Sequence, residues 1–486
     1  MSDRRKQLGQ FFTPSDIARS LVSWVVEKPT DRVLDPSCGD GGFLVWHQRA
    51  VGVELDLNNA RIARERAPSA LVHGGDFFRW ATSTKERFEA IAGNPPFIRY
   101  QNFAGDTRAH ALAAATMMGA DFSALTSSWA PFVIVAAGLL KPGGRMAFVV
   151  PAEIGHAGYA RTLLPALCAR FARVQIVACR EKLFPQLSED CWLLHCTGYG
   201  AHTNTIHLSV LERFVPNDAP PTAARAVSLA EWRAAGERLR PFLLPTGSLA
   251  LYQTLTDSAR VRRLGELASA GIGYVTGANE FFHLRPSEAE RRGLPRKFLR
   301  VAVRKTEQLP DGVINKATVR RWLDADAPVL LLDLREAREL PASVRSYLDE
   351  EPGQAARLTY KCKNRAPWYV VPDIKVPDAF LSVMSGTRPT LVRNEAACVC
   401  TNSLHAVVLR PGVEAASLQR GWNSPLAQLG AEIEGHPLGG GMLKLEPREA
   451  TRVPVPIDDL RLSRTDAETL AAATRRMRAW RHQAAA

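Results

Sequence analysis

The sequence predicts a doubly wound α/β domain with a mostly parallel sheet between residues 30 and 200. Seven apolar runs in this region have the length and composition of buried strands, and amphipathic stretches such as 57–66, 129–140 and 160–171 lie between several of them. This alternation is typical of a parallel sheet covered by helices. The runs are, in order, RVLDP, AVGVEL, ALVHGGD, FEAIAGN, RMAFVVP, RVQIVAC and CWLLHCTG.

Composition and charge narrow the class of protein. The chain has 486 residues, of which 46% are hydrophobic, enough for two or three domains with cores of their own. Its formal charge of +13 indicates a polyanionic partner, and nucleic acid is the commonest partner of this kind. The alternative explanation of the charge is a generally arginine-rich protein from a GC-rich genome.

The cysteines and the apolar runs indicate an intracellular protein. The eight cysteines lack the spacing of a zinc site, so we expect reduced, mostly buried thiols and no metal. The N-terminal residues have no hydrophobic segment of a signal peptide, and the longest apolar run, 131–140, is too short to span a bilayer. We therefore expect a cytoplasmic protein without a membrane partner.

Composition divides the chain into four parts. Residues 1–214 contain the α/β pattern, and residues 215–248, rich in proline and alanine, are predicted to be a linker. Residues 249–462 have short strands, many glycines and clustered arginines, which predict a second, mixed α/β domain. In 463–486 we expect a C-terminal helix and tail, with Thr465 and Glu468 forming a capping box.

A glycine-rich turn follows the first predicted strand, in the stretch VLDPSCGDGGFL at 33–44. It matches neither the dinucleotide pattern GxGxxG nor the nucleoside triphosphate loop. The next two strands end at Glu54 and at Asp76–Phe77, and open α/β sheets bind ligands at this edge. Glu54 is expected to bind a ribose diol, Asp76 the amine of an adenine and Phe77 its ring face. The alternative is that these acids only cap the following helices.

A rigid Asn-Pro-Pro-Phe segment, Asn94–Phe97, follows the fourth strand. Proline fixes its own φ and donates no ladder hydrogen bond, so the two prolines end the strand. The side-chain oxygen of Asn94 and the carbonyl of Pro95 are two acceptors for an NH2 group, and binding both hydrogens favours attack by its nitrogen on a methyl sulfonium. Phe97 provides a face for base stacking. A purely structural turn is the alternative.

Together these motifs resemble the gamma class of DNA adenine-N6 methyltransferases of restriction–modification systems. LGQFFTP (8–14), DPSCGDGGFL (35–44), Glu54, Asp76–Phe77 and NPPF (94–97) occur in the order of that family. The resemblance implies the class I S-adenosylmethionine-dependent methyltransferase fold, with a doubly wound seven-stranded sheet in the catalytic domain 1–214. It implies S-adenosyl-L-methionine as cofactor, held by Thr13, Asp35, Pro36, Cys38, Gly39, Gly41, Phe43, Glu54, Asp76, Phe77 and Asn94. The catalytic residues that it implies are Asn94, Pro95, Pro96 and Phe97.

The resemblance has two weaker points in this half. The family more often has tyrosine where this chain has Phe97, which preserves stacking but removes any hydroxyl contact. The family's second aromatic for the base precedes a proline in a later element, and KLFPQLSED offers Phe184 at that position. A core aromatic is the alternative for Phe184.

The second half resembles, more loosely, the target-recognition region of the same enzymes, at 271–284, 361–372, 400–409 and 438–450. The run 291–305 carries seven basic residues and no acid, and basic residues alternate with aromatics after residue 360. Such mixtures follow a phosphate backbone and stack on bases, although a charge run is usually a solvated face. The expected DNA contacts are Arg296, Lys297, Lys361, Lys363, Arg365, Trp368 and Tyr369.

The resulting prediction is a site-specific methyltransferase acting on N6 of a flipped adenine in double-stranded DNA. Alternatives are an RNA adenine-N6 methyltransferase, a protein-glutamine methyltransferase and a non-catalytic DNA-specificity subunit. Because LGQFFTP begins near residue 1 and no acidic–acidic–lysine cluster lies outside the two domains, we expect methylation only, with any restriction endonuclease on another chain. We expect a monomer. The recognition sequence does not follow from one chain.

Overall fold

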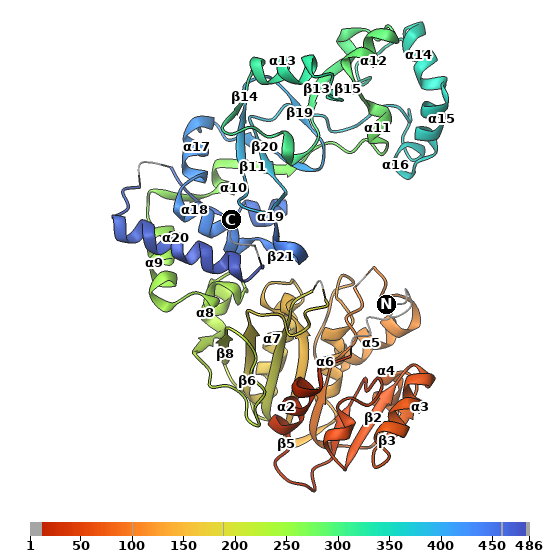
Figure 1. Cartoon of the computed structure of the whole chain (residues 1–486), viewed down its shortest axis with the longest axis vertical. Coiled ribbons are helices and arrows are strands. Elements are labelled where there is room, and N and C mark those ends of the chain that lie inside the picture. Colours follow the sequence, from red (N-terminus) through yellow and green to blue (C-terminus); the bar gives the residue numbers. More distant parts are fainter. Residues whose placement is uncertain (1–11, 100, 188, 458–459, 483–486) are drawn as a thin grey trace. The chain divides into compact units, whose positions relative to one another are not determined.

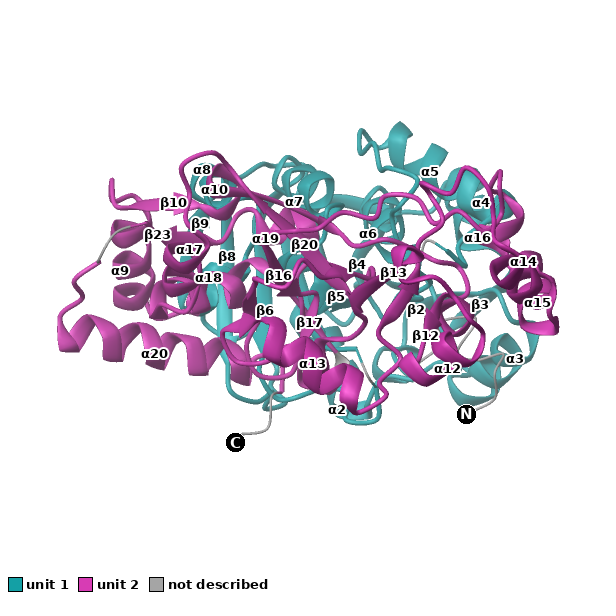
Figure 2. Ribbon diagram, turned by 90° about the horizontal axis from the view of Figure 1, so that it is seen from above, with its two compact units in different colours: residues 1–243 teal, residues 244–486 magenta. Residues whose placement is uncertain are grey.

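The computed structural model describes residues 12–99, 101–187, 189–457 and 460–482 (Figure 1). The chain forms two compact units, Met1–Leu243 and Leu244–Ala486, which Figure 2 colours separately. Their boundary lies within 215–248, the stretch expected to be a linker.

A nine-stranded sheet forms the centre of unit 1, in the order β3-β2-β1-β4-β5-β7-β6-β8-β9. Strands β3 to β5 run parallel, β7 is antiparallel to both of its neighbours, β8 is parallel to β6, and β9 is antiparallel to β8. The strands are β1 (Val33–Asp35), β2 (Ala50–Glu54), β3 (Leu71–Gly74), β4 (Phe88–Gly93), β5 (Leu140–Pro151), β6 (Phe171–Cys179), β7 (Cys191–Tyr199), β8 (Thr205–Leu211) and β9 (Arg225–Ser228).

All seven predicted strands are confirmed, and β8 and β9 extend the sheet beyond them. The sequence did not indicate these two strands as members of the sheet. β9 is only four residues long, and β8 mixes polar and apolar residues because it is less buried than the central strands. Residues 225–243, within the expected linker, also form helix α8 (Leu229–Ala234), which begins with a capping box of Ser228 and Glu231, and the 3-10 turn η3 (Arg240–Leu243).

Helices cover the sheet because residues on both of its faces are apolar. Ala90 and Ala92 of β4 belong to a cluster with the apolar stripe of α2, whereas Ile91 between them points to the other face and is equally buried. Helix α6, all of whose residues are buried, packs on β5. The helices are α2 (Ser15–Val25), α3 (Leu57–Arg66), α4 (Phe77–Ser83), α5 (Gly105–Met117), α6 (Trp129–Ala137) and α7 (Ala160–Cys168).

Unit 2 is a mixed α/β structure, as predicted, with several small sheets. A five-stranded sheet has the order β11-β20-β16-β18-β14 and a four-stranded sheet the order β12-β15-β13-β19. Their strands are β11 (Ala268–Ile272), β12 (His283–Leu284), β13 (Leu299–Val303), β14 (Val313–Ile314), β15 (Leu330–Leu332), β16 (Ala379–Ser382), β18 (Leu391–Asn394), β19 (Val399–Cys400) and β20 (Leu404–Leu409). Two smaller sheets pair β10 (Val261–Arg263) with β23 (Pro454–Pro456), and β17 (Met384–Ser385) with β22 (Met442–Lys444) and β21 (His436–Leu438).

The helices of unit 2 surround two main cores. One core lies around β13 and β15, and the other is built from the five-stranded sheet with α17 and α18. The longer helices are α9 (Thr246–Thr256), α13 (Lys316–Asp324), α14 (Ala342–Asp349), α15 (Glu351–Leu358), α17 (Ala415–Trp422), α18 (Pro425–Glu434) and α20 (Arg464–Ala479).

The C-terminal helix α20 begins two residues earlier than predicted. Ser463, not Thr465, is the N-cap, and its side chain accepts a hydrogen bond from the backbone N of Asp466. Either residue type caps a helix well, so the choice depends on where the helix packs. All eight cysteines are free and buried, as predicted. Among the described residues, no helix is long and apolar enough to cross a membrane, and no three His, Cys, Asp or Glu side chains gather as a metal site.

Candidate active site

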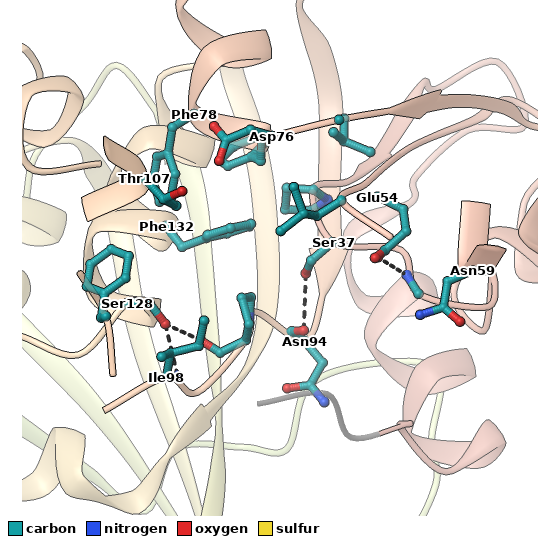
Figure 3. A pocket seen from close by; sticks show the side chains of 18 of the residues that line it. Ser37, Glu54, Asn59, Asp76, Phe78, Asn94, Ile98, Thr107, Ser128 and Phe132 are labelled. Carbon is teal, nitrogen blue, oxygen red and sulfur yellow. Dashed lines mark hydrogen bonds between the residues drawn. The ribbon is translucent and has the colours of Figure 1, made fainter. Parts of the chain in front are cut away.

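A pocket lies at the carboxyl ends of β1 to β4 (Figure 3). Its lining comes from the glycine-rich turn, from the ends of β2 and β3, from the segment after β4, and from residues near α5 and α6. Its empty space, open solvent included, is about 890 Å³. Of the residues predicted to bind the cofactor, the pocket is lined by Pro36, Gly39, Glu54, Asp76, Phe77 and Asn94.

Three predicted cofactor residues instead hold the glycine-rich turn in place. Cys38 is buried in a small core with residues of α3, and its backbone N donates to the carbonyl of Val53, 2.9 Å away. Gly41 has φ +85°, and a Cβ there would lie 3.2 Å from Cα of Ala63. Phe43 packs into the core beside α2. The side chains of Cys38 and Phe43 and the Cα of Gly41 thus shape the turn from behind, and contact of these residues with the cofactor stays a prediction.

Asp35, the last residue of β1, is buried directly behind the pocket wall. Its Oδ1 accepts from the backbone N of Ser37, 3.1 Å away, whereas Oδ2 is buried and has no hydrogen-bond partner among the described residues. Burial, with a smaller contribution from the neighbouring carboxylates of Glu54 and Asp40, raises the pKa of Asp35 to about 8. A buried acceptor without a donor is costly, so this oxygen fits a ligand that brings a donor or a positive charge.

Glu54 and Asp76 have structural contacts as well as a place in the pocket lining. Glu54 accepts from the backbone N of Gly39 (2.9 Å) and of Asp56 (2.8 Å), and burial raises its pKa. Asp76 caps α4 by accepting from the backbone N of Arg79, 2.9 Å away. The helix-cap alternative is thus correct for Asp76, yet its carboxylate also lines the pocket. A carboxylate has about four lone-pair sites, so these bonds leave capacity for a ligand.

An aromatic wall closes the end of the pocket near Asp76. Phe77 stacks on Phe132 of α6, with ring centroids 4.4 Å apart and an interplanar angle of 27°, and Phe78 meets Phe132 edge-on. Figure 3 shows Phe132 between this end and Asn94. Sequence reasoning missed Phe132 because α6 is apolar on all sides, so nothing in its pattern distinguishes a residue facing a pocket from one facing the core.

The Asn-Pro-Pro segment is fixed beside the glycine-rich turn. The hydroxyl of Ser37 donates to the backbone carbonyl of Asn94, 3.1 Å away (Figure 3). Residue 93 has to be glycine for steric reasons, because a Cβ at that position would lie 2.8 Å from Oδ1 of Asp35. Asn94 and Pro96 line the pocket, while Pro95 is buried. The predicted proximity of NPPF to the first glycine turn is thus present in the structure.

The two aromatics expected to contact a base differ in exposure. Phe97 is half-buried and packs against the core cluster that contains Phe184. Phe184 is only 2% exposed and lies in that core, which favours the alternative of a core aromatic, and its contact with a base stays a prediction. The sequence around an aromatic residue that precedes a proline does not show whether its side chain points into the core or into a site.

The N-terminal motif LGQFFTP is described only from Phe12. Thr13 is half-buried and is not in the pocket lining, whereas Phe12 is, at 3.6 Å from where a Cβ of Gly39 would lie. Phe12 was not singled out from the sequence. Residues 8–11 of the motif lie outside the described residues.

The predicted DNA contacts of unit 2 divide into exposed cations and packed side chains. Arg296 and Lys297, on the 3-10 turn η4 (Arg296–Phe298), and Lys361 and Lys363, on the short helix α16 (Tyr360–Lys363), are exposed. The other three predicted contacts are half-buried. Arg365 donates a hydrogen bond to the carbonyl of Val275 at 2.6 Å. Trp368 contacts Phe281 and Phe282, and Tyr369 contacts Trp368.

The basic run 291–305 is not a continuous basic surface. Arg292 pairs with Glu350 and Glu288. Two more of its arginines are bound within unit 2: Arg300 pairs with Asp333 at 2.6 Å and Arg304 with Glu280 at 2.8 Å. The run contains no acid, but the fold brings acids from other segments to these arginines.

The fold and the site together define the class of protein. The strand order of unit 1, the antiparallel β7 and a pocket at the carboxyl ends of β1 to β4 are those of a class I S-adenosylmethionine-dependent methyltransferase. The family described as "Type II methyltransferase M.Eco57I, C-terminal domain" matches residues 237–485, more than half of the chain. "N-6 DNA Methylase" matches residues 1–64, and "Eco57I restriction-modification methylase" matches residues 50–181.

The chain therefore belongs to the M.Eco57I family of type II methyltransferases, and it is a DNA methyltransferase of the restriction–modification type. This confirms the resemblance seen in the sequence. M.XamI of Xanthomonas campestris pv. amaranthicola is 24% identical over 94% of this chain and 86% of its own length. M.AccI of Acinetobacter calcoaceticus is 20% identical over 84% of this chain and 76% of its own length.

A solved structure supports the fold across both units. The type IIL restriction-modification enzyme MmeI, determined in complex with DNA, has a TM-score of 0.53 and 14% identity to this chain. The likeness covers 97% of this chain and 66% of that one, so this chain spans about two thirds of the MmeI length. At this identity the likeness concerns the fold alone.

Proposed function

We propose that this enzyme transfers the methyl group of S-adenosyl-L-methionine to N6 of an adenine flipped out of double-stranded DNA. The observation that carries the proposal is the Asn94–Pro95–Pro96 segment, tied through Ser37 to the glycine-rich turn at the edge of the pocket. A segment so placed brings an acceptor pair for an amino group next to a cofactor site. The acceptor pair suits any planar amino group, and the assignment to adenine N6 is supported by the match of residues 1–64 to the N-6 DNA Methylase family.

The residues present fit the cofactor. The orphaned, buried Oδ2 of Asp35 suits the ammonium group of its methionine end. Glu54 is available to the ribose, and Asp76 with the Phe77–Phe132 pair offers an acid and an aromatic wall for the adenine ring. When bound, the cofactor supplies an electrophilic methyl group on a sulfonium.

The chain's own contribution to transfer is positioning and electrostatics. The oxygens of Asn94 and Pro95 accept the two amino hydrogens of the base, which directs the nitrogen lone pair at the methyl carbon. The N6–C bond forms as the S–C bond breaks, and one amino proton leaves to solvent. Phe97 provides a ring face for the extruded base. No strongly basic side chain is needed, because the proton is lost from an already cationic nitrogen.

For unit 2 we propose a DNA-binding and target-recognition role. Its exposed cations Arg296, Lys297, Lys361 and Lys363 suit phosphate contacts, which position a protein on a duplex without reading its sequence. We also assign any cognate restriction activity to a separately encoded chain and expect a monomer to act on DNA.

The test is incubation with tritiated S-adenosylmethionine and, in parallel, duplex DNA, RNA or protein. We expect label in duplex DNA, recovered as N6-methyladenine after digestion, and its loss in Asn94→Ala. The exposed Asn204→Ala is the matched control and should retain activity. Label in RNA or protein alone would refute the proposal, and so would an active Asn94→Ala enzyme.

A further inference from the structure

Ser128 makes three hydrogen bonds to the Asn-Pro-Pro-Phe-Ile segment, although it lies 30 residues further along the chain from Ile98. Its hydroxyl donates to the carbonyl of Pro96 and accepts from the backbone N of Ile98, 3.0 Å away. Its own backbone N donates to the carbonyl of Ile98, also at 3.0 Å. Figure 3 shows Ser128 beside Ile98, away from Ser37, which holds the other end of the segment at Asn94.

The position of Ser128 makes this use of its hydroxyl unusual. Ser128 is the residue before α6, where serine normally caps the helix by accepting from a backbone N in its first turn. Here it makes no side-chain cap bond and has helical backbone angles, φ −59° and ψ −34°. The side chain is 2% exposed. Its hydrogen-bonding capacity therefore serves the neighbouring segment instead of its own helix.

The segment needs such external support. After β4 ends at Gly93, Pro95 and Pro96 have no N–H with which to join a ladder. The proline ring fixes φ, but ψ stays free, and ψ decides where each carbonyl points. Ser37 fixes the carbonyl of Asn94 and Ser128 fixes that of Pro96. The carbonyl of Pro95 lies between these two anchored peptide groups.

We propose that Ser128 is a positioning residue for methyl transfer, which holds the Pro95 carbonyl and the Asn94 side chain in the orientation that binds the target amino group. The inference rests on the proposed function. Ser128 acts through the segment and does not itself need to touch the reacting atoms. Loss of the hydroxyl should disturb the transfer step while cofactor binding and DNA binding remain.

The experiment compares Ser128→Ala, Ser128→Thr and the neighbouring control Ser127→Ala in single-turnover methyl transfer to duplex DNA. Single turnover isolates chemistry from product release. For Ser128→Ala we expect a rate about ten- to a hundredfold lower, the range caused by small misplacement of reacting groups. Cofactor affinity, by calorimetry, should stay within about threefold, since Ser128 contacts the acceptor segment. The threonine variant keeps the hydroxyl and should recover most of the rate.

Two further readouts separate positioning from folding. The melting temperature shows whether each variant is folded at the assay temperature, and 2-aminopurine at the target position reports base extrusion. Folded Ser128→Ala that flips the base normally but transfers slowly supports the proposal. An unchanged rate, or a loss explained by unfolding or by weaker cofactor binding, overturns it. If the wild-type enzyme methylates RNA or protein but not DNA adenine, the proposed function fails first, and this inference fails with it.

Discussion

Asp35 is buried at the end of β1 with one carboxylate oxygen that has no hydrogen-bond partner among the described residues. Its pKa of about 8 lies above the ordinary value of 3.8, because burial disfavours the charged form. The folded protein therefore keeps a proton that the unfolded chain has released. The contribution of Asp35 to stability is full below its unfolded pKa and is lost as pH rises toward 8, by up to about 1.4 kcal/mol per pH unit.

Asp35→Asn removes this titration. In the absence of ligand, we expect the melting temperature of the variant minus that of wild type to increase as pH rises from about 5 to 8. We also expect S-adenosylmethionine to bind about ten- to a hundredfold more weakly, because a charge-assisted hydrogen bond to the cofactor is lost. Scanning calorimetry and titration calorimetry measure the two effects.

Asp40→Asn, on the same turn, is the matched control for cofactor affinity, since its carboxylate pairs with Arg66 outside the pocket. A pH-independent difference in melting temperature between Asp35→Asn and wild type would contradict the assigned titration. Unchanged cofactor affinity in Asp35→Asn would contradict the assigned contact.

The end of helix α20 is joined to α18 through the buried carboxylate of Glu432, which pairs with Arg481 and with Arg478. Arg481, just after the helix, and Glu432 of α18 are both fully buried, with bonds of 2.9 Å from Nε and Nη2 to the two carboxylate oxygens. The guanidinium also donates to the carbonyls of Gly386 and Thr387, each at 2.9 Å. Nε, Nη1 and Nη2 of the guanidinium thus all donate to acceptors, which is the condition for a buried charge to be tolerated.

Arg481→Ala should destabilise unit 2 by about 3 kcal/mol, the lower end for a broken buried ion pair, because Glu432 would lose its fully buried partner while Arg478 remains 3.0 Å away. Urea unfolding monitored by fluorescence measures this change, and the exposed Arg475→Ala on the same helix should change stability by less than about 0.5 kcal/mol. Equal effects of the two substitutions would mean that the helix end does not depend on this ion pair.

At the scale of the whole molecule, the net charge of +13 does not mean that every cation is available to DNA. In unit 2, Arg292, Arg300 and Arg304 neutralise acids of their own unit, so they are poorly available to a phosphate backbone. Lys361 and Lys363 are exposed on a four-residue helix that is fixed from below by the buried Cys362. Cations of this kind contribute most to non-specific affinity.

The double substitution Lys361→Ala/Lys363→Ala should weaken DNA binding about equally for all sequences. The slope of log K against log salt should fall by about 2, close to one for each phosphate contact. Fluorescence anisotropy over a salt series measures both quantities. The control pair Lys85→Ala/Arg87→Ala, two exposed cations of unit 1, should leave the slope unchanged; an equal fall in both double variants would indicate only a general charge effect.

The sequence by itself determined the features that are local in the chain. Buried strands appear as apolar runs, so all seven central strands were predictable, and the glycine and proline motifs follow from backbone constraints that any fold must respect. This is why Asp35, Glu54, Asp76 and Asn94 could be assigned to one edge of a sheet. Parallel strands place their carboxyl ends together whatever the remaining structure does.

Only the tertiary structure decided which side chains from distant segments meet. Phe132 and Ser128 reach the site from α6 and its start, and Phe12 from the N-terminal segment, whereas Phe43 and Phe184 turn into the core. The acids that neutralise the basic run come from elsewhere in unit 2, and β8 joins the sheet by pairing with β6 and β9 by pairing with β8. Packing between segments far apart in sequence is set by the sum of many weak contacts, and no local pattern encodes that sum.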